Sequence, residues 1–104
     1  MIRRSSKDAN HNAVVSRFLA LGCTVIQIHA TGIPGLPDLG VGCAGVTYLV
    51  EVKNPGTAYG RAGMTATQTA FARDWRGGRV WVVQSEDEAT ALVKNWRRRM
   101  GGNN

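Results

Sequence analysis

The chain has 104 residues, 43% of them hydrophobic, and carries 13 Lys and Arg against 7 Asp and Glu, for a formal net charge of +6. This length favours one compact domain over residues 1–104, with short basic tails at both ends, and leaves no room for two cores. No apolar run reaches membrane length, so we expect a cytoplasmic protein and no membrane partner.

The positive charge is concentrated at the two ends of the chain. One group comprises Arg3, Arg4 and Lys7, and the other Arg97, Arg98 and Arg99. Such an excess favours a polyanionic partner, and we expect the first group to contact phosphates, although basic termini also serve solubility. Three acids at residues 86–88 match the dipole at the start of a helix and predict a structural role.

The first half of the chain predicts one helix and three strands. Apolar positions at helical spacing predict a helix over about 7–21, begun by Ser5 or Ser6 and ended by Gly22. A β-branched run predicts a strand over 23–29, and two Gly and two Pro make 31–37 a loop. Strands over 38–41 and 46–54 form a hairpin through the small residues 42–45.

The second half predicts a loop, a helix, a strand and a last helix. Three glycines make 55–63 an exposed loop, from which Arg61 is expected to contact the polyanionic partner. Thr65 and Gln68 form a capping-box pattern for a helix ending near Gly77, and a strand over 79–84 precedes a helix that begins at Ser85. The predicted order is α-β-β-β-α-β-α, an α/β fold with a mixed central sheet flanked by helices.

Five further residues are expected to be buried for structural reasons. The two cysteines have no paired metal-ligand spacing and are predicted to be small core residues. The three tryptophans fall on apolar stripes, which favours core or dimer contacts over base stacking. These residues are Cys23, Cys43, Trp75, Trp81 and Trp96.

The hairpin brings three charged residues together. Because side chains alternate along a strand, Glu51 and Lys53 point to the same face. A turn near Cys43 and Ala44 places residue 38 opposite about 49–51, so the Asp38 carboxylate approaches that of Glu51.

Two carboxylates on a mostly buried surface repel each other, and a divalent cation between them removes that cost. Mg²⁺ keeps several waters, so Asp38, Glu51 and the Val52 carbonyl would suffice as protein ligands. A cation there can activate water and shield a phosphate under attack. Lys53, on the same face, could orient that water or stabilise the developing charge.

These residues resemble the PD-(D/E)XK nuclease superfamily, whose motif reads here as Pro37-Asp38 followed by Glu51-Val52-Lys53. The stretch 32–83 is similar to its VRR-NUC branch of small phage and bacterial nucleases, with Pro-Asp-Leu, a hairpin, Glu-Val-Lys and Thr-x-x-Gln on a helix. The resemblance implies a restriction-endonuclease-like core, a bacterial or phage-infected host cell, and Mg²⁺- or Mn²⁺-dependent DNA cleavage. It also implies that Asp38, Glu51 and the Val52 carbonyl bind metal, that Lys53 assists the nucleophile and that Gln68 supports substrate or water.

The first helix departs from the family pattern. Relatives often carry an acid there, where this chain has His11. Asp8 from one turn earlier, or Asn10 or His11 through water, could replace it, or activity could be weakened; the sequence leaves these alternatives open.

Other interpretations of the same residues remain. An isolated Glu-x-Lys is usually an exposed ion pair, and Gln68 could be only the capping partner of Thr65. A homodimer that cuts both strands of branched or flapped DNA is expected, against a monomeric nickase. The alternatives to an enzyme are a catalytically weak or inactive nucleic-acid-binding module on the same fold and a purely electrostatic RNA-binding protein.

Overall fold

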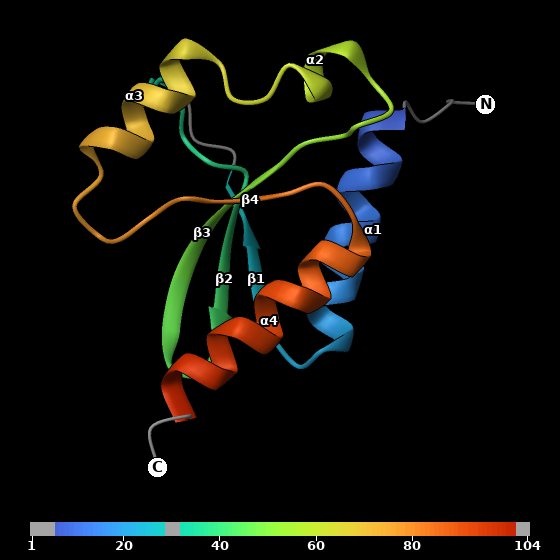
Figure 1. The fold of residues 1–104 in the computed structure, drawn as a ribbon, viewed down its shortest axis with the longest axis vertical. Helices are drawn as coiled ribbons and strands as arrows, with labels where there is room; N and C mark the ends of the chain where they lie inside the picture. The colour runs from blue at the N-terminus through green and yellow to red at the C-terminus, as the bar shows by residue number, and fades with distance from the viewer. Residues whose placement is uncertain (1–5, 29–31, 102–104) are drawn as a thin grey trace.

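The computed structural model describes residues 6–28 and 32–101 (Figure 1). Its elements are α1 (Ser6–Ala20), β1 (Thr24–Gln27), β2 (Leu39–Cys43), β3 (Val46–Val52), α2 (Ala58–Arg61), α3 (Ala66–Asp74), β4 (Trp81–Val83) and α4 (Glu86–Gly101). The predicted succession is confirmed, with α2 as an addition. Within the described ranges, no helix is both long and apolar enough to cross a membrane.

The strands form one mixed sheet in the order β1-β2-β3-β4. The pairs β1–β2 and β2–β3 are antiparallel, whereas β4 lies parallel to β3. Helices α1 and α4 pack against each other and against the sheet, while α2 and α3 lie beyond the end where β3 finishes (Figure 1). The strands are shorter than predicted at most ends, and β2 begins one residue after Asp38.

The core fills the space between the sheet and the pair α1 and α4. Trp96 of α4 is fully buried, with its ring stacked on Tyr48 at 4.0 Å between centroids and on Phe18 at 5.9 Å. Trp81 meets the Trp96 ring edge-on at 5.8 Å. The predictions that Trp81, Trp96 and both cysteines are core residues are confirmed.

Residues in left-handed conformations end the first helix and form the turn of the hairpin. Gly22 has φ +86°, and the N–H of Cys23 bonds the carbonyl of Phe18, which closes α1. The hairpin turns at Ala44 and Gly45, with φ 52° and 82°, as a type I′ turn does. This centre lies one residue later than predicted and lengthens β2 to Cys43.

The expectation that residues 55–63 are only a loop was wrong, because they include α2. Asn54 accepts the N–H of Gly56 on its side chain, and its carbonyl accepts the hydroxyl of Thr57. Thr57 then caps α2 by accepting the N–H of Gly60 at 2.9 Å. Short-range side-chain bonds therefore order a segment whose glycine content indicated an open loop.

The acids at 86–88 have the structural role predicted for them. Glu86 and Asp87 lie 3.4 and 3.9 Å from the guanidinium of Arg17, joining α4 to α1. Glu88 accepts the N–H of Gln84, and Ser85 accepts the N–H of Glu88. Of the two roles predicted for Trp75, a place in the core is wrong, because the residue is 44% exposed at the end of α3. A dimer contact stays a prediction.

Candidate functional site

The candidate site lies on the sheet face that α1 and α4 do not cover. Leu39 pairs with Val50 in the core, so the alternating positions Asp38 and Glu51 point away from it. Continuing the register by one residue places these two opposite each other, at the end of the predicted range 49–51. The hairpin geometry expected from the sequence is confirmed.

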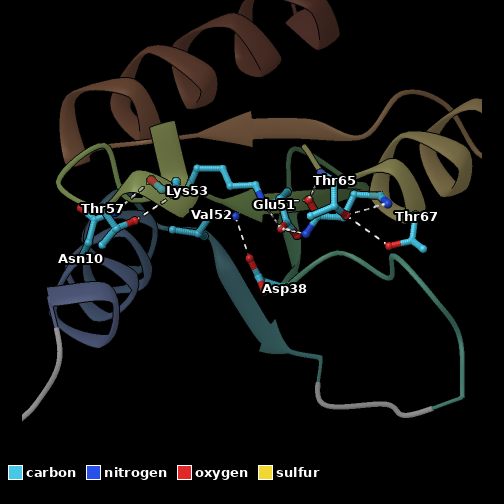
Figure 2. Close-up of polar contacts among 10 residues, drawn as sticks. Asn10, Asp38, Glu51, Val52, Lys53, Thr57, Thr65 and Thr67 are labelled. Atoms are coloured by element: carbon cyan, nitrogen blue, oxygen red, sulfur yellow. Dashed lines mark hydrogen bonds and ion pairs between the residues drawn. The ribbon is translucent and has the colours of Figure 1, made fainter. Parts of the chain in front are cut away.

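Asp38 is fixed by a bond to the backbone of the neighbouring strand. The N–H of Val52 donates to its Oδ2 at 2.8 Å (Figure 2). The carboxylate is half-buried and lies directly before the first residue of β2. This bond orients the acid toward the end of β3.

Glu51 and Lys53 form a buried ion pair. Their exposed fractions are 4% and 3%, and Lys53 Nζ lies 3.4 Å from Glu51 Oε2. The expectation that acid and base share a face is confirmed, and the alternative of an exposed surface pair is wrong for these burial values. Removing each of these charges from water costs several kcal/mol before the ion pair offsets it. The stability of the fold alone therefore does not explain why this pair is buried.

Gln68 connects α3 to this pair. Its Nε2 donates to Glu51 Oε2 at 2.5 Å, and its Oε1 accepts Lys53 Nζ at 2.7 Å (Figure 2). The same Oε1 accepts the N–H of Thr65 at 2.9 Å, while the Thr65 hydroxyl accepts the N–H of Gln68. The capping box is therefore present, and the residue that completes it also contacts both charges.

Glu51 has the most perturbed acidity of the site. Burial, followed by the negative charge of Asp38, raises its pKa from 4.5 to about 7, although Lys53 opposes the change. A hydrogen bond with Asp38 acts in the same direction as burial, so the two carboxyl groups lie close together. Glu51 therefore changes its charge near neutral pH, as perturbed carboxyl groups at functional sites often do.

A polar cavity of about 70 Å³ joins these groups. Its lining residues are Asp38, Glu51, Val52, Lys53, Asn54, Thr57, Gly60 and Gln68. Sequence reasoning missed Asn54, Thr57 and Gly60, although the Asn-Pro-Gly turn before Thr57 was the available signal. A Cβ on Gly60 would lie 1.9 Å from the Asn54 carbonyl oxygen, so only glycine fits there.

The first helix reaches the site through Asn10. Its amide Nδ2 donates to the carbonyl of Lys53 at 3.2 Å (Figure 2). His11 instead bonds the side chain of Gln27 at 2.9 Å. Of the alternatives for the first helix, Asn10 is therefore next to the site strand and His11 is directed to β1. The side chains of Lys7 and Asp8, like Arg3 and Arg4, lie outside the described residues. Arg61 is exposed and donates to the Pro55 carbonyl.

The donor set suits a hard divalent cation. Asp38 and Glu51 supply carboxylate oxygens beside the Val52 backbone, and the cavity has room for an ion with a few waters. In residues 6–28 and 32–101, no group of three His, Cys, Asp or Glu side chains is placed to hold a metal. A cation would therefore depend on two carboxylates, backbone oxygen and water.

Comparison with known proteins gives one informative similarity. No protein-family model and no curated protein matches the chain. A solved structure described as a "VRR_NUC domain" is 28% identical, with a TM-score of 0.70, over 89% of this chain and 99% of that one. The likeness supports the resemblance found in the sequence. The fold is thus a mixed α/β fold of the restriction-endonuclease-like kind, with a four-stranded sheet flanked by helices.

Proposed function

We propose that this chain is a divalent-cation-dependent nuclease of the PD-(D/E)XK type that hydrolyses phosphodiester bonds in DNA. The observation that carries the proposal is the buried Glu51–Lys53 pair facing Asp38, in a chain similar to a VRR_NUC domain. A charged cluster that burial disfavours is typical of a functional site. The net charge of +6 matches a polyanionic substrate.

The roles follow from chemistry and position. Asp38, Glu51 and the Val52 carbonyl would hold Mg²⁺ or Mn²⁺, which supplies charge neutralisation at the phosphate and a more acidic water. Lys53 lines the same cavity, where its ammonium group would stabilise the negative charge that develops on a bound phosphate. Gln68 positions both charged groups through its amide.

Substrate contact would come mainly from basic residues around the cavity. Arg61, exposed beside it on α2, is suited to a phosphate, and Arg3, Arg4 and Lys7 remain candidates from the sequence. A chain of this size offers one site, so cutting both strands would require a homodimer. We expect it to select branched or flapped DNA by shape rather than by base sequence.

The alternative is a nucleic-acid-binding module on the same fold that has lost catalytic activity. The observation that favours it is that His11, where relatives often carry an acid, bonds Gln27 rather than extending the carboxylate pair. Weak cation affinity would then limit cleavage while leaving nucleic-acid binding intact.

Cleavage assays separate the two candidates. Branched, flapped and plain duplex DNA are incubated with the parent protein and Mg²⁺ or Mn²⁺. The same assay is run with Asp38→Ala and with Arg98→Ala, a control that changes an exposed residue of α4. We expect cleavage by the parent and by Arg98→Ala only. No cleavage of any substrate by the parent would overturn the enzyme proposal, and cleavage by Asp38→Ala would overturn the site assignment.

A further inference from the structure

The surface beyond the candidate site carries an exposed tryptophan that the catalytic proposal does not use. Trp75 ends α3 and is 44% exposed, and its indole stacks on Phe71 at 5.5 Å with an angle of 15° between the rings. A Cβ on Gly77 would lie 2.7 Å from the Trp75 Nε1, so this glycine lets the indole lie against the chain. The ring is therefore held in one orientation with part of its surface open to solvent.

Trp75 lies between two hollows. One, of about 320 Å³, is lined along α3 by Thr67, Ala70 and Phe71 and closed by Pro34. The other, of about 360 Å³, runs toward β3, β4 and the end of α4, where Arg79 and Arg99 meet Trp81. Trp75 lines both hollows, which we together call the Trp75 track.

The second hollow is positively charged. The Arg79 guanidinium lies 4.1 Å from the centroid of Trp81, and that of Arg99 lies 5.9 Å from it. No acid lines this hollow in the described part of the chain. Asp74, which lines the first hollow, is paired with Arg73 at 2.8 Å. The track thus combines an aromatic face with uncompensated arginine charge.

The track leads to the candidate site. Gln68 lines the site cavity, and Phe71 and Trp75, which follow it at helical spacing, line the track. Seven residues of helix span about 10 Å, which is roughly three stacked nucleotides of one strand. A strand bound along α3 would therefore reach the carboxylates.

We propose that the Trp75 track binds single-stranded nucleic acid, with a base stacked on Trp75 and phosphates paired with Arg79 and Arg99. Single strands are bound by an aromatic platform beside a basic groove, because every base has a π-face and every link a charge. The proposal rests on the nuclease function above in one respect only, which is where the bound strand lies relative to the candidate site.

A second copy of the chain is the less suitable occupant. A two-fold interface sets a surface patch against itself, so the arginines of both copies would share it, and Asp74, the acid that lines the track, is already paired with Arg73. A polyanion instead neutralises them. The favoured ligand is thus nucleic acid, and self-association becomes an outcome that the experiment distinguishes.

Binding is measured in EDTA, so that cleavage plays no part, by fluorescence anisotropy of labelled oligo(dT) and oligo(U) of about 15 nucleotides. We expect Trp75→Ala to weaken binding roughly 5- to 100-fold and Trp75→Phe to retain most of it. Arg79→Ala should lower the slope of log K against log salt, whereas Arg98→Ala, outside the track, should change affinity less. The ratio of the affinities for oligo(dT) and oligo(U) shows whether DNA or RNA is preferred. Weaker binding of either oligomer by Trp75→Ala supports the proposal.

Two results would overturn the inference. One is parent-like affinity of Trp75→Ala for both oligomers. The other is a dimeric parent that Trp75→Ala converts to a monomer in sedimentation, which would assign the track to a second copy. Failure of the nuclease proposal is separate: a parent that cuts no DNA but binds through Trp75 leaves this inference standing. Circular dichroism of Trp75→Ala checks that the variant is folded.

Discussion

The amide of Gln68 donates to Oε2 of Glu51 across 2.5 Å, which ties the start of α3 to the end of β3 at the candidate site. The opposite end of the same amide accepts the ammonium of Lys53. One neutral side chain therefore satisfies both members of a buried ion pair. Its loss leaves each charge short of a partner in a low-dielectric environment.

Gln68→Ala is expected to lower cleavage about 10- to 100-fold, because Glu51 and Lys53 lose their common positioning contact. It also removes half of the capping box, at a cost of about 1 kcal/mol in the free energy of unfolding. Thr65→Ala is the matched control, since it removes the cap and keeps the amide beside Glu51. Single-turnover rates that fall equally in both variants would show that Gln68 acts only through the helix.

Lys53→Met keeps the length of a buried side chain and removes its charge. We expect cleavage to fall by about 10² or more, as for loss of one electrostatic group at a reacting phosphate. Lys53 also lowers the pKa of Glu51, so the rising limb of the pH–rate profile should move to higher pH in this variant. The profile is the diagnostic readout; a lower rate with an unmoved limb would contradict the coupling of Lys53 to Glu51.

The free energy of unfolding should depend on pH through Glu51. Burial and Asp38 raise its pKa from 4.5 to about 7, so in that interval the folded protein holds a proton that the unfolded chain has released. Stability from this group is therefore full below pH 4.5 and is lost as pH rises to 7, by about 3 kcal/mol in all. Urea titrations of the parent and Glu51→Gln at several pH values measure the difference, which should decline across this interval. A difference that stays constant would contradict the buried-acid assignment.

Because a cation and a proton compete for the Glu51 carboxylate, Mn²⁺ should raise the melting temperature more at pH 8 than at pH 6. The effect should disappear in Asp38→Ala. Differential scanning fluorimetry at both pH values, with Ca²⁺ as a second ion, gives the comparison. An equal shift in Asp38→Ala would indicate that the cation binds elsewhere.

The tryptophans should differ sharply in their contribution to stability. Trp96 is fully buried between Phe18 and Tyr48, so Trp96→Ala should cost about 3–5 kcal/mol, a large part of the stability of a small domain. Trp75 is exposed at the end of α3, so Trp75→Ala should lower the free energy of unfolding by about 1 kcal/mol or less. Urea midpoints measured for both variants test this, and similar midpoints would contradict the placement of Trp75 outside the core.

The sequence predicted the hairpin and the shared face of Glu51 and Lys53 because both follow from local rules. A strand alternates its side chains, and a small-residue turn fixes which positions face each other, so Asp38 could be placed opposite Glu51. The cap formed by Thr65 and Gln68 is also local in sequence.

What the sequence could not give depends on how distant segments meet. The bond from Asn10 to the Lys53 carbonyl joins residues 43 positions apart, and no periodicity records it. Helix α2 depends on the close approach of Gly60 to Asn54, where glycine was interpreted only as a loop signal. Trp75 lies on an apolar stripe like Trp96, but no other element covers the end of α3 in the described residues, so the same pattern gave opposite burial.

The central claim is that Asp38 and Glu51 together bind a divalent cation. Anomalous diffraction from crystals of the protein soaked in Mn²⁺ near pH 8 locates the ion directly. We predict a peak within roughly 2 to 2.5 Å of a carboxylate oxygen from each residue and of the Val52 carbonyl. A peak confined to the exposed acids of α4, or none at Asp38 and Glu51, would contradict the account.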